Sequence, residues 1–430
     1  MATTPLRIGM IGGGTVGGGT LELVMGRLKG RAGRPLIVTK ICVKDLSKPR
    51  SFHLDESTKL TNNVDTILDH PEIDMVVEVM GGTTLAKRVV ETSLKNQKPV
   101  VTANKALIAE NLDEIHQLCK DSKVGFGYEA AVCGGIPIIQ TIQSCYAGDI
   151  IHSISGIMNG TTNYMLGKMQ QGIDYDAVLK EAQDLGYAEA DPTADVEGHD
   201  VRAKICILAK LAFGVTVPVE SVPCQGISHL SSVDFEYAKL LNCTIKLIGT
   251  AQRLHEAREW DGALCVYVSP VMVQNDHVLA NVQSNGNAVA VNSANMGECC
   301  YMGPGAGRFP TANSVVADIV RLADETGEPK DPFPVSSSLE LDHDYVSIFY
   351  IRIPYCDGLG IIKRVGELAE ACGVSIHSIL QNPIRDRMSA DFCVTTEECK
   401  YSQVQELCAS IGEQDFCRSP CVSMPLTGDM

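Results

Sequence analysis

The chain has 430 residues, too many for one ordinary hydrophobic core, and at roughly 150 residues per domain it should hold two to four domains. Its 45% hydrophobic and 20% charged residues are typical of a soluble globular protein. The formal net charge of −16 and the lack of a lysine-arginine run argue against nucleic acids and anionic membranes as partners and favour small molecules. The sequence contains no uninterrupted apolar run of about 18 residues, so no membrane span is expected.

The 17 cysteines have irregular spacing and no CxxC pair, so they predict neither a disulfide framework nor a metal cluster. Seven of them fall between Cys356 and Cys421. Without a recognisable signal peptide the expected location is the cytoplasm, a reducing compartment in which most of these thiols would act as small buried hydrophobes.

An apolar strand is expected from Leu6 to Ile11, and the motif Gly12-x-Gly14-x-x-Gly17 follows it directly, before a helical pattern. In this context the first glycine permits a tight turn, the second lets a pyrophosphate approach the backbone, and the third lets helix and strand pack closely. The motif therefore predicts a dinucleotide-binding site. The alternative is a glycine-rich turn without a ligand.

A second strand is expected from Leu36 to Val43, and charged residues of both signs follow it. Asp45 would accept a hydrogen bond from a ribose 2′-hydroxyl, whereas Lys44, Lys48 and Arg50 would favour a 2′-phosphate. The basic residues outnumber the acid, so NADP is preferred over NAD by a small margin.

Two further segments read as buried strands that end in residues suited to a ligand. Residues 73–82 run into glycines, and residues 99–107 carry Thr102, Asn104 and Lys105 at the strand end. The carboxyl ends of parallel strands form the ligand crevice of an open α/β sheet, so this polar cluster is expected there. The alternative is a helix cap followed by an exposed lysine.

Residues 125–137 read as another strand that leads into a glycine turn. Such a turn can direct several backbone carbonyls inward to bind a cation, although a plain turn is the simpler interpretation. From about Ile150 the pattern changes, with an alternating strand over residues 151–158 and a polar turn and helix start over residues 159–164. A second domain is expected to begin here.

The stretch from Gly186 to Lys204 concentrates carboxylates, a histidine, an arginine and a lysine directly before an apolar helical segment. If a helix begins near Val196, Asp200 and Lys204 lie at i and i+4 on one face. Such a pair is commonly a surface ion pair. The apolar continuation here favours a partly desolvated lysine suited to proton transfer.

Residues 263–273 and 277–290 are expected to be strands of the same mixed sheet. The glycine- and proline-rich residues 302–314 then read as a loop that feeds a helix ending near Glu325. This loop could close over a phosphate or a nicotinamide, or serve as a hinge to the first domain. Residues 325–334 read as a linker.

The last 85 or so residues show a strand, helix, strand, strand, helix order typical of ferredoxin-like folds. The expected elements are strands at 345–353, 374–381 and 388–396 and helices at 360–372 and 403–411. Nothing in them suggests catalytic machinery, so a binding or pairing module is expected.

Taken together, the motifs resemble those of homoserine dehydrogenases that carry a C-terminal ACT regulatory domain. Four motifs carry the resemblance, in order: GGGTVG at Gly12–Gly17, VTANKAL at Val101–Leu107, GYAEADPTADVEGHD at Gly186–Asp200 followed by Lys204, and GPGAGRFPTANSV at Gly303–Val315. The resemblance implies an α/β fold of three parts: a Rossmann-type parallel-sheet domain (1–148 with a return helix at 311–330), a mixed α+β substrate and dimerisation domain (149–310) and a ferredoxin-like βαββαβ ACT domain (343–430).

The family interconverts L-homoserine and L-aspartate 4-semialdehyde with NAD or NADP. By resemblance, Lys204 is the proton donor and acceptor, Lys105 is a second catalytic lysine, and Glu189 and Asp200 bind the substrate. Asp195 is added as a substrate-binding candidate, although the motif gives it no firm task. The remaining implied residues are the cofactor contacts Gly12, Gly14, Thr15, Val16, Gly17, Lys44, Thr102, Lys105, Gly186 and Gly303, and the sodium-site residues Glu129, Val132, Gly134 and Ile136.

The tail departs from the usual ACT pattern Asp-x-Pro-Gly-x-Leu, because residues 357–362 keep the aspartate and the second glycine but place Leu359 where the proline belongs. An amino-acid effector such as threonine is therefore only half supported by the motif. A homodimer or homotetramer is expected from the family. Two alternatives stay open: an oxidoreductase for another amino-acid semialdehyde, and a catalytically silent sensor of nucleotide and amino acid.

Overall fold

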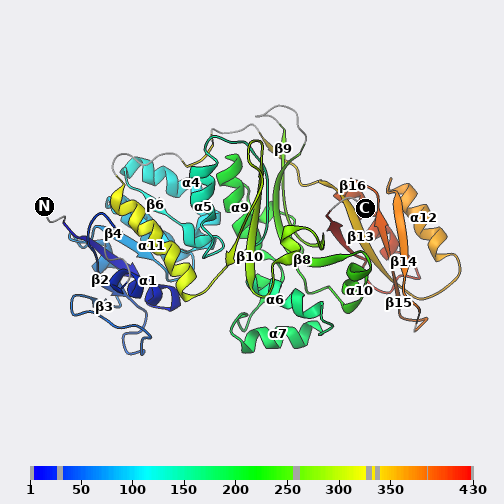
Figure 1. Ribbon diagram of the computed structural model, residues 1–430, viewed down its shortest axis with the longest axis horizontal. Helices are drawn as coiled ribbons and strands as arrows, with labels where there is room; N and C mark the ends of the chain where they lie inside the picture. Colours follow the sequence, from blue (N-terminus) through cyan, green and yellow to red (C-terminus); the bar gives the residue numbers. More distant parts are fainter. Residues whose placement is uncertain are drawn as a thin grey trace. The chain divides into compact units, whose positions relative to one another are not determined.

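The computed structural model describes residues 4–26, 32–254, 262–325, 332–334, 339–384 and 386–427. They form two compact units that interleave along the chain (Figure 1). Unit 1 comprises Met1–Ile151, Ala203–Ser221 and Ser293–Ser337, and unit 2 comprises His152–Arg202, Val222–Asn292 and Ser338–Met430. None of the helices in these described ranges is long and apolar enough to cross a membrane.

Unit 1 contains a six-stranded parallel sheet with the strand order β3-β2-β1-β4-β5-β6, which is the Rossmann order. The predicted Rossmann-type sheet is therefore confirmed. Its strands are β1 (Leu6–Ile11), β2 (Leu36–Cys42), β3 (Lys59–Thr61), β4 (Met75–Glu78), β5 (Val100–Thr102) and β6 (Phe126–Gly127).

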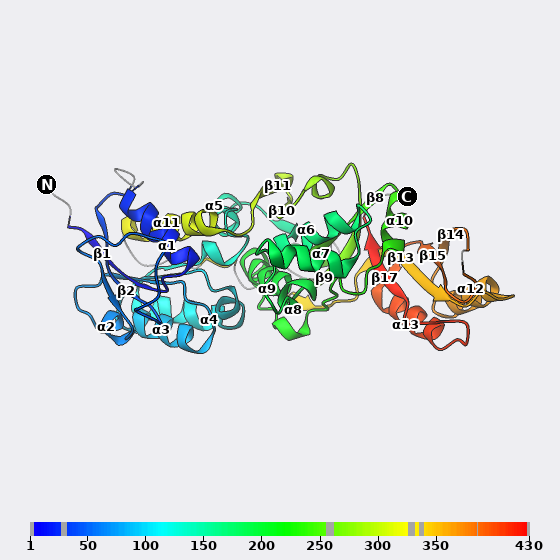
Figure 2. The same ribbon diagram turned by 90° about the horizontal axis from the view of Figure 1, so that it is seen from below.

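Helices connect these strands and cover the sheet, as Figure 2 shows from below. They are α1 (Thr15–Gly26), α2 (Asp65–Leu68), α3 (Thr84–Lys95), α4 (Lys105–Ser122), the 3-10 turn η1 (Glu129–Ala131), α5 (Ile138–Cys145) and α11 (Arg308–Asp324). The last of these, α11, packs on α1 through Gly19, where a Cβ would lie only 2.7 Å from the carbonyl oxygen of Arg308. A helix returning from residue 308 thus completes the core of unit 1.

Most of an 11-stranded mixed sheet lies in unit 2, in the order β10-β7-β8-β9-β17-β13-β15-β14. The strands are β7 (Ile151–Ile157), β8 (Cys243–Leu254), β9 (Ala263–Gln274), β10 (Gly286–Ser293), β13 (Val346–Tyr355), β14 (Ile376–Gln381), β15 (Ala390–Thr396) and β17 (Val422–Leu426). Two short strands, β12 (Glu340–Leu341) and β16 (Cys399–Lys400), pair with β9 and β13.

The helices of unit 2 are α6 (Gly160–Met169), α7 (Tyr175–Asp184), α8 (Thr193–Val196), α10 (Ser232–Leu240), α12 (Ile361–Ala371) and α13 (Tyr401–Gly412). One helix, α9 (His199–Phe213), begins in unit 2 and continues into unit 1 from Ala203 onward. Asp200 therefore belongs to unit 2 and Lys204 to unit 1.

The C-terminal elements have the βαββαβ order that was predicted, and their strand order β17-β13-β15-β14 is that of a ferredoxin-like sheet. This module does not stand apart from the sheet of the preceding segment, because β17 also pairs with β9 at Leu426 and Met272. The domain boundaries drawn from the sequence, and the ACT assignment, stay predictions.

Two expectations about strands and loops were wrong. Residues 277–290 do not form one strand, because His277 caps a 3-10 turn, η3 (Val278–Asn281), and β10 begins only at Gly286. The glycine- and proline-rich loop is shorter than expected, since β11 (Gly297–Pro304) runs into it and α11 begins at Arg308. Pro310 fits in the first turn of a helix, where its missing N–H has no partner to lose.

The helix that carries Asp200 and Lys204 begins at His199 and not near Val196. Gly198, with φ of +80°, separates the short helix α8 from α9. The predicted i, i+4 relation still holds, because both residues lie within α9.

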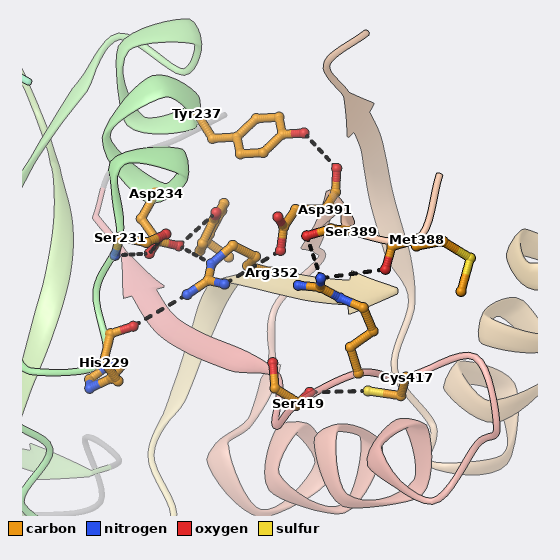
Figure 3. A network of polar contacts seen from close by, with 12 residues as sticks. His229, Ser231, Asp234, Tyr237, Arg352, Met388, Ser389, Asp391, Cys417 and Ser419 are labelled. Atoms are coloured by element: carbon orange, nitrogen blue, oxygen red, sulfur yellow. Dashed lines mark hydrogen bonds and ion pairs between the residues drawn. The ribbon is translucent and has the colours of Figure 1, made fainter. Parts of the chain in front are cut away.

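A buried ion pair ties the C-terminal module to α10 (Figure 3). The guanidinium of Arg352 on β13 donates to Asp234 Oδ1 at 2.8 Å, and the hydroxyl of Tyr350 donates to the same oxygen at 3.0 Å. Asp234 is 0% exposed, and its second oxygen accepts a hydrogen bond from the Ser231 backbone at 2.9 Å. Every oxygen of this buried carboxylate is thus paired.

We expect Arg352→Ala to lower the free energy of unfolding by roughly 3–5 kcal/mol, because it leaves the buried charge of Asp234 without its cation. Chemical denaturation of wild type and variant measures the difference. Arg364→Ala is the matched control, since Arg364 pairs with Glu367 on the exposed face of α12, and its loss should stay below about 1 kcal/mol. Equal losses in the two variants would contradict a special role of the buried pair.

Candidate active site

The glycine-rich turn between β1 and α1 has the shape of a dinucleotide-binding loop. Gly12 has φ of +114°, and a Cβ there would lie 2.4 Å from the Val79 carbonyl oxygen. A Cβ on Gly17 would lie 2.2 Å from the Gly12 carbonyl oxygen, so the helix can approach the strand only with glycine. Gly14 has no atom within 4 Å of its Cβ position, which leaves room for a phosphate beside the N-terminus of α1, next to Thr15 and Val16.

Polar side chains from β4 and β5 meet at the carboxyl edge of the same sheet. The buried carboxylate of Glu78 accepts hydrogen bonds from the Thr102 hydroxyl at 2.6 Å and from the Met80 backbone at 2.9 Å. Asn104 caps α4 by accepting from the Leu107 backbone and donates to the Gly82 carbonyl at 2.6 Å. The predicted polar cluster therefore lies at the expected sheet edge, and its asparagine is also a helix cap.

One of the charged residues that follow β2 contacts the glycine-rich turn. Lys44 is exposed, and Asp45 accepts hydrogen bonds from the Ser47 side chain and backbone, which hold the pKa of its carboxyl below the usual value. Arg50 donates to the carbonyl oxygens of Gly13, at 3.3 Å, and Asp45. A guanidinium thus lies directly beside the glycine-rich turn.

Asp200 and Lys204 are both buried on α9, at 5% and 7% exposure, one helical turn apart. A solvent-exposed surface ion pair is therefore excluded for them. Buried charges of this kind need fixed polar partners.

Asn159 is a partner that the sequence interpretation did not assign. Its side-chain amide donates to Asp195 Oδ1 at 2.7 Å and to Asp200 Oδ2 at 2.9 Å. Its oxygen accepts from the Thr162 backbone at 2.9 Å, which makes Asn159 the N-cap of α6. The polar turn at residues 159–164 was recognised as a helix start, but only the structure shows that its first residue joins two carboxylates.

The segment that leads to α8 lies at the surface of unit 2. Gly186 has φ of +74° and is exposed, and the carboxylate of Glu189 is exposed as well. The Tyr187 carbonyl accepts a hydrogen bond from the Thr161 hydroxyl at 2.7 Å, which anchors this segment to α6. Within unit 2 the structure thus brings Asp195 and Asp200 together through Asn159 and leaves Glu189 open to solvent.

The four predicted sodium-site residues, Glu129, Val132, Gly134 and Ile136, are all buried. Cys133 and Gly134 have φ of +51° and +37°, so the chain turns tightly between them. The turn packs against the glycine- and proline-rich segment, because a Cβ on Gly134 would lie 2.5 Å from the Gly305 carbonyl oxygen and one on Gly303 would lie 3.3 Å from Ile136.

Several hydrogen bonds already engage this turn. The Gly134 carbonyl accepts from the Ser314 hydroxyl at 2.5 Å, and the Ile136 carbonyl accepts from the Ile138 backbone at 2.8 Å. The carboxylate of Glu129 accepts from two backbone N–H groups of α5, and burial raises its pKa to about 7. Carbonyl oxygens have two lone pairs, so these bonds are compatible with a cation bound to the same oxygens.

Helices α4 and α9 lie side by side in unit 1 and line a cavity of about 220 Å³. Lys210 on α9 pairs with Asp113 on α4 at 2.9 Å. Lys105, half-buried at the first position of α4, and Lys204 on α9 therefore belong to neighbouring helices of one unit.

Comparisons with known proteins agree with this arrangement. Residues 12–129 match the family model "Homoserine dehydrogenase, NAD binding domain", and residues 137–320 match the model "Homoserine dehydrogenase". A homoserine dehydrogenase of Bacillus subtilis is 38% identical over 413 residues, which are 93% of this chain and 94% of that protein. The chain belongs to the homoserine dehydrogenase family.

Solved structures support the same conclusion over the full length. A homoserine dehydrogenase from Thiobacillus denitrificans matches 99% of the chain and 98% of its own with a TM-score of 0.90 and 33% identity. A hyperthermophilic archaeal homoserine dehydrogenase in complex with NADPH covers 76% of the chain with a TM-score of 0.63, but at 24% identity this likeness concerns the fold alone.

Family membership makes the chain an NAD(P)-dependent oxidoreductase that acts on a CH–OH group, and not a catalytically silent sensor. The glycine-rich turn fits the nicotinamide cofactor that homoserine dehydrogenases use, since Gly14 leaves space where a phosphate would lie. The roles of the individual site residues stay predictions, as do NADP preference and sodium binding.

Asp195 and Asp200 share the amide of Asn159, so we expect Asn159→Asp to lower the stability of the fold in a pH-dependent way. The new carboxylate keeps the cap of α6 but crowds two others, which raises carboxyl pKa values in the folded state above about 4. The folded state then binds more protons than the unfolded state, so stability should fall as pH rises from about 4 to 7, by roughly 1–3 kcal/mol.

Denaturation of wild type and variant at pH 4, 5.5 and 7 measures this difference as a function of pH. Asn275→Asp is the control, because Asn275 is exposed and bonds to Asn242. A difference between wild type and Asn159→Asp that does not grow with pH would contradict the expected crowding of the three carboxylates.

Proposed function

We propose that this chain interconverts L-homoserine and L-aspartate 4-semialdehyde, with Lys204 as the proton donor and acceptor at the terminal oxygen of the substrate. The observation that carries the proposal is the pair of buried, oppositely charged residues on α9 in a chain with a Rossmann-type sheet. The bound nicotinamide supplies and accepts the hydride.

Reduction of an aldehyde builds negative charge on its oxygen. An ammonium near that oxygen stabilises the charge and can donate the proton, and in the oxidation it accepts the proton from the alcohol. Lys204 suits this task because its burial excludes water and the helix fixes its position. Lys105, on the neighbouring helix α4, is proposed as a second cation at the reacting centre.

The substrate also carries a permanent ammonium group, which must be paired when it leaves water. Asp200 and Glu189 are proposed to bind it, with Asp195 alongside. Asn159 supports this assignment, because its amide satisfies one oxygen of each aspartate and so fixes the direction in which the others point. Gly186 and Gly303 are proposed as cofactor contacts by family resemblance.

NADP is the proposed cofactor. Arg50 lies beside the glycine-rich turn and donates to Gly13, and Lys44 of the same segment is exposed, so this segment offers cations for a 2′-phosphate. Both hydrogen bonds from Ser47 go to Asp45 Oδ1, so this oxygen is less available to a ribose hydroxyl. This arrangement supports NADP over NAD.

A sodium ion at the carbonyls of Glu129, Val132, Gly134 and Ile136 is a further part of the proposal, supported by the tight buried turn at Cys133 and Gly134. A homodimer or homotetramer, an amino-acid effector on the C-terminal module and a cytoplasmic location stay predictions from family resemblance.

We expect Lys204→Ala to lower kcat for homoserine oxidation by at least about 100-fold, the usual contribution of a general acid or base. Binding of NADPH, followed by its fluorescence, should change little. Lys180→Ala is the matched control, because Lys180 is exposed on α7 and pairs with Asp184. A kcat of Lys204→Ala within twofold of wild type would remove Lys204 from the mechanism.

We expect Arg50→Ala to raise the KM for NADPH by about tenfold or more, since a hydrogen bond to a charged group contributes roughly 1.5–3 kcal/mol. The KM for NADH should change much less, because NADH lacks the 2′-phosphate. Steady-state rates with both cofactors test this, with Lys48→Ala, an exposed lysine nearby, as the control. Equal changes for the two cofactors would argue against a phosphate contact.

A further inference from the structure

The C-terminal module groups three cysteines that the dehydrogenase chemistry does not use. Cys408 lies on α13, and Cys417 and Cys421 lie in the segment between α13 and β17. All three line one surface pocket of about 470 Å³. The side chain of Cys421 hydrogen-bonds with the side chains of both Cys408 and Cys417, so three sulfur atoms meet at one place.

Packing and backbone bonds hold these thiols in position. The three half-buried side chains pack against the hydrophobic core of the module, and the Cys417 backbone donates to the Gln414 carbonyl at 2.9 Å and pairs with Tyr355 of β13. Figure 3 shows Cys417 and Ser419 beside the polar network of Arg352, and the guanidinium of Arg418 reaches Ser389 and Met388 in the same region.

A metal site does not account for this cluster, because no group of three or more His, Cys, Asp or Glu side chains among the described residues is arranged to hold a metal ion. A purely apolar role does not account for it either, since the thiols face a pocket that is open to solvent-sized molecules. Two effects raise the pKa of Cys421: the larger is its hydrogen bond with Cys408, and the next is its burial. Cys421 is therefore protonated at neutral pH and donates toward the sulfur of Cys408.

We propose that Cys408 and Cys421 form a thiol–disulfide exchange site for low-molecular-weight disulfides. The Cys408 thiolate attacks one sulfur of the disulfide R–S–S–R and releases one thiolate, RS⁻. Cys421 then loses its proton and attacks the Cys408 sulfur of the mixed disulfide, which releases the second RS⁻. The two cysteines lose two electrons and two protons, and the small disulfide becomes two RSH.

The test treats the native full-length protein with glutathione disulfide, alkylates the remaining thiols and digests with trypsin without reduction. Cleavage after Lys400 and Arg418 places Cys408 in the peptide 401–418 and Cys421 in the peptide 419–430. We expect two fewer alkylated thiols from this region and a disulfide-linked pair of these two peptides, reversed by dithiothreitol.

Single variants identify the partners, because Cys408 and Cys417 share a tryptic peptide. The linked pair should disappear in Cys408→Ser and in Cys421→Ser and persist in Cys417→Ser and in the control Cys372→Ser, a half-buried cysteine outside the pocket. The melting temperature of each variant confirms that it is folded. Survival of the linked pair in Cys408→Ser, stable mixed disulfides without a linked pair, or no loss of thiols would each overturn the proposal.

Discussion

Two opposite charges, the carboxylate of Asp200 and the ammonium of Lys204, are buried one turn apart on α9, and this burial constrains what can surround them. A buried charge is stable only where fixed polar groups replace water. For Asp200 one such group is the amide of Asn159, which the cap of α6 holds in place. A carboxylate positioned by a side chain that is itself fixed can receive a charged ligand without reorganising.

In unit 1 a buried carboxylate likewise needs fixed polar partners, at the carboxyl edge of the parallel sheet. Glu78 is fully buried, and Thr102 and the Met80 backbone satisfy its two oxygens, while Asn104 connects this edge to α4 and to Gly82. These polar groups hydrogen-bond to one another and to nearby backbone atoms, so they shape this edge of the sheet and their bonds do not depend on a ligand. The open position at Gly14 is then the place where a phosphate can approach the N-terminus of α1.

Local signals made the Rossmann-type sheet and the βαββαβ order of the C-terminal module predictable, whereas contacts between residues far apart in the sequence were not. The order of strand, glycines and helix at residues 6–26 depends on neighbours in sequence, and the structure confirms it. The bonds of Asn159 to residues 36 and 41 positions away, and that of Arg352 to Asp234 at 118 positions, leave no local pattern. Strand β8 was not predicted from the sequence, because it is buried almost throughout and also contains a lysine. The ammonium of this residue, Lys246, donates to Asn163 and to the Val282 carbonyl inside the core.

The C-terminal module is coupled to the sheet of unit 2 by two kinds of contact. Tyr345 stacks on Tyr267 of β9 with ring centroids 4.0 Å apart, which is an apolar contact, and β17 pairs with β9 at Leu426 and Met272. The other is polar, since Arg352 on β13 donates to Asp234 of α10 and to the His229 carbonyl. A ligand on this module can change catalysis only by favouring one of two arrangements. Arg352 holds the buried charge of Asp234, so any shift of the module relative to α10 must either preserve this pair or leave that charge unpaired.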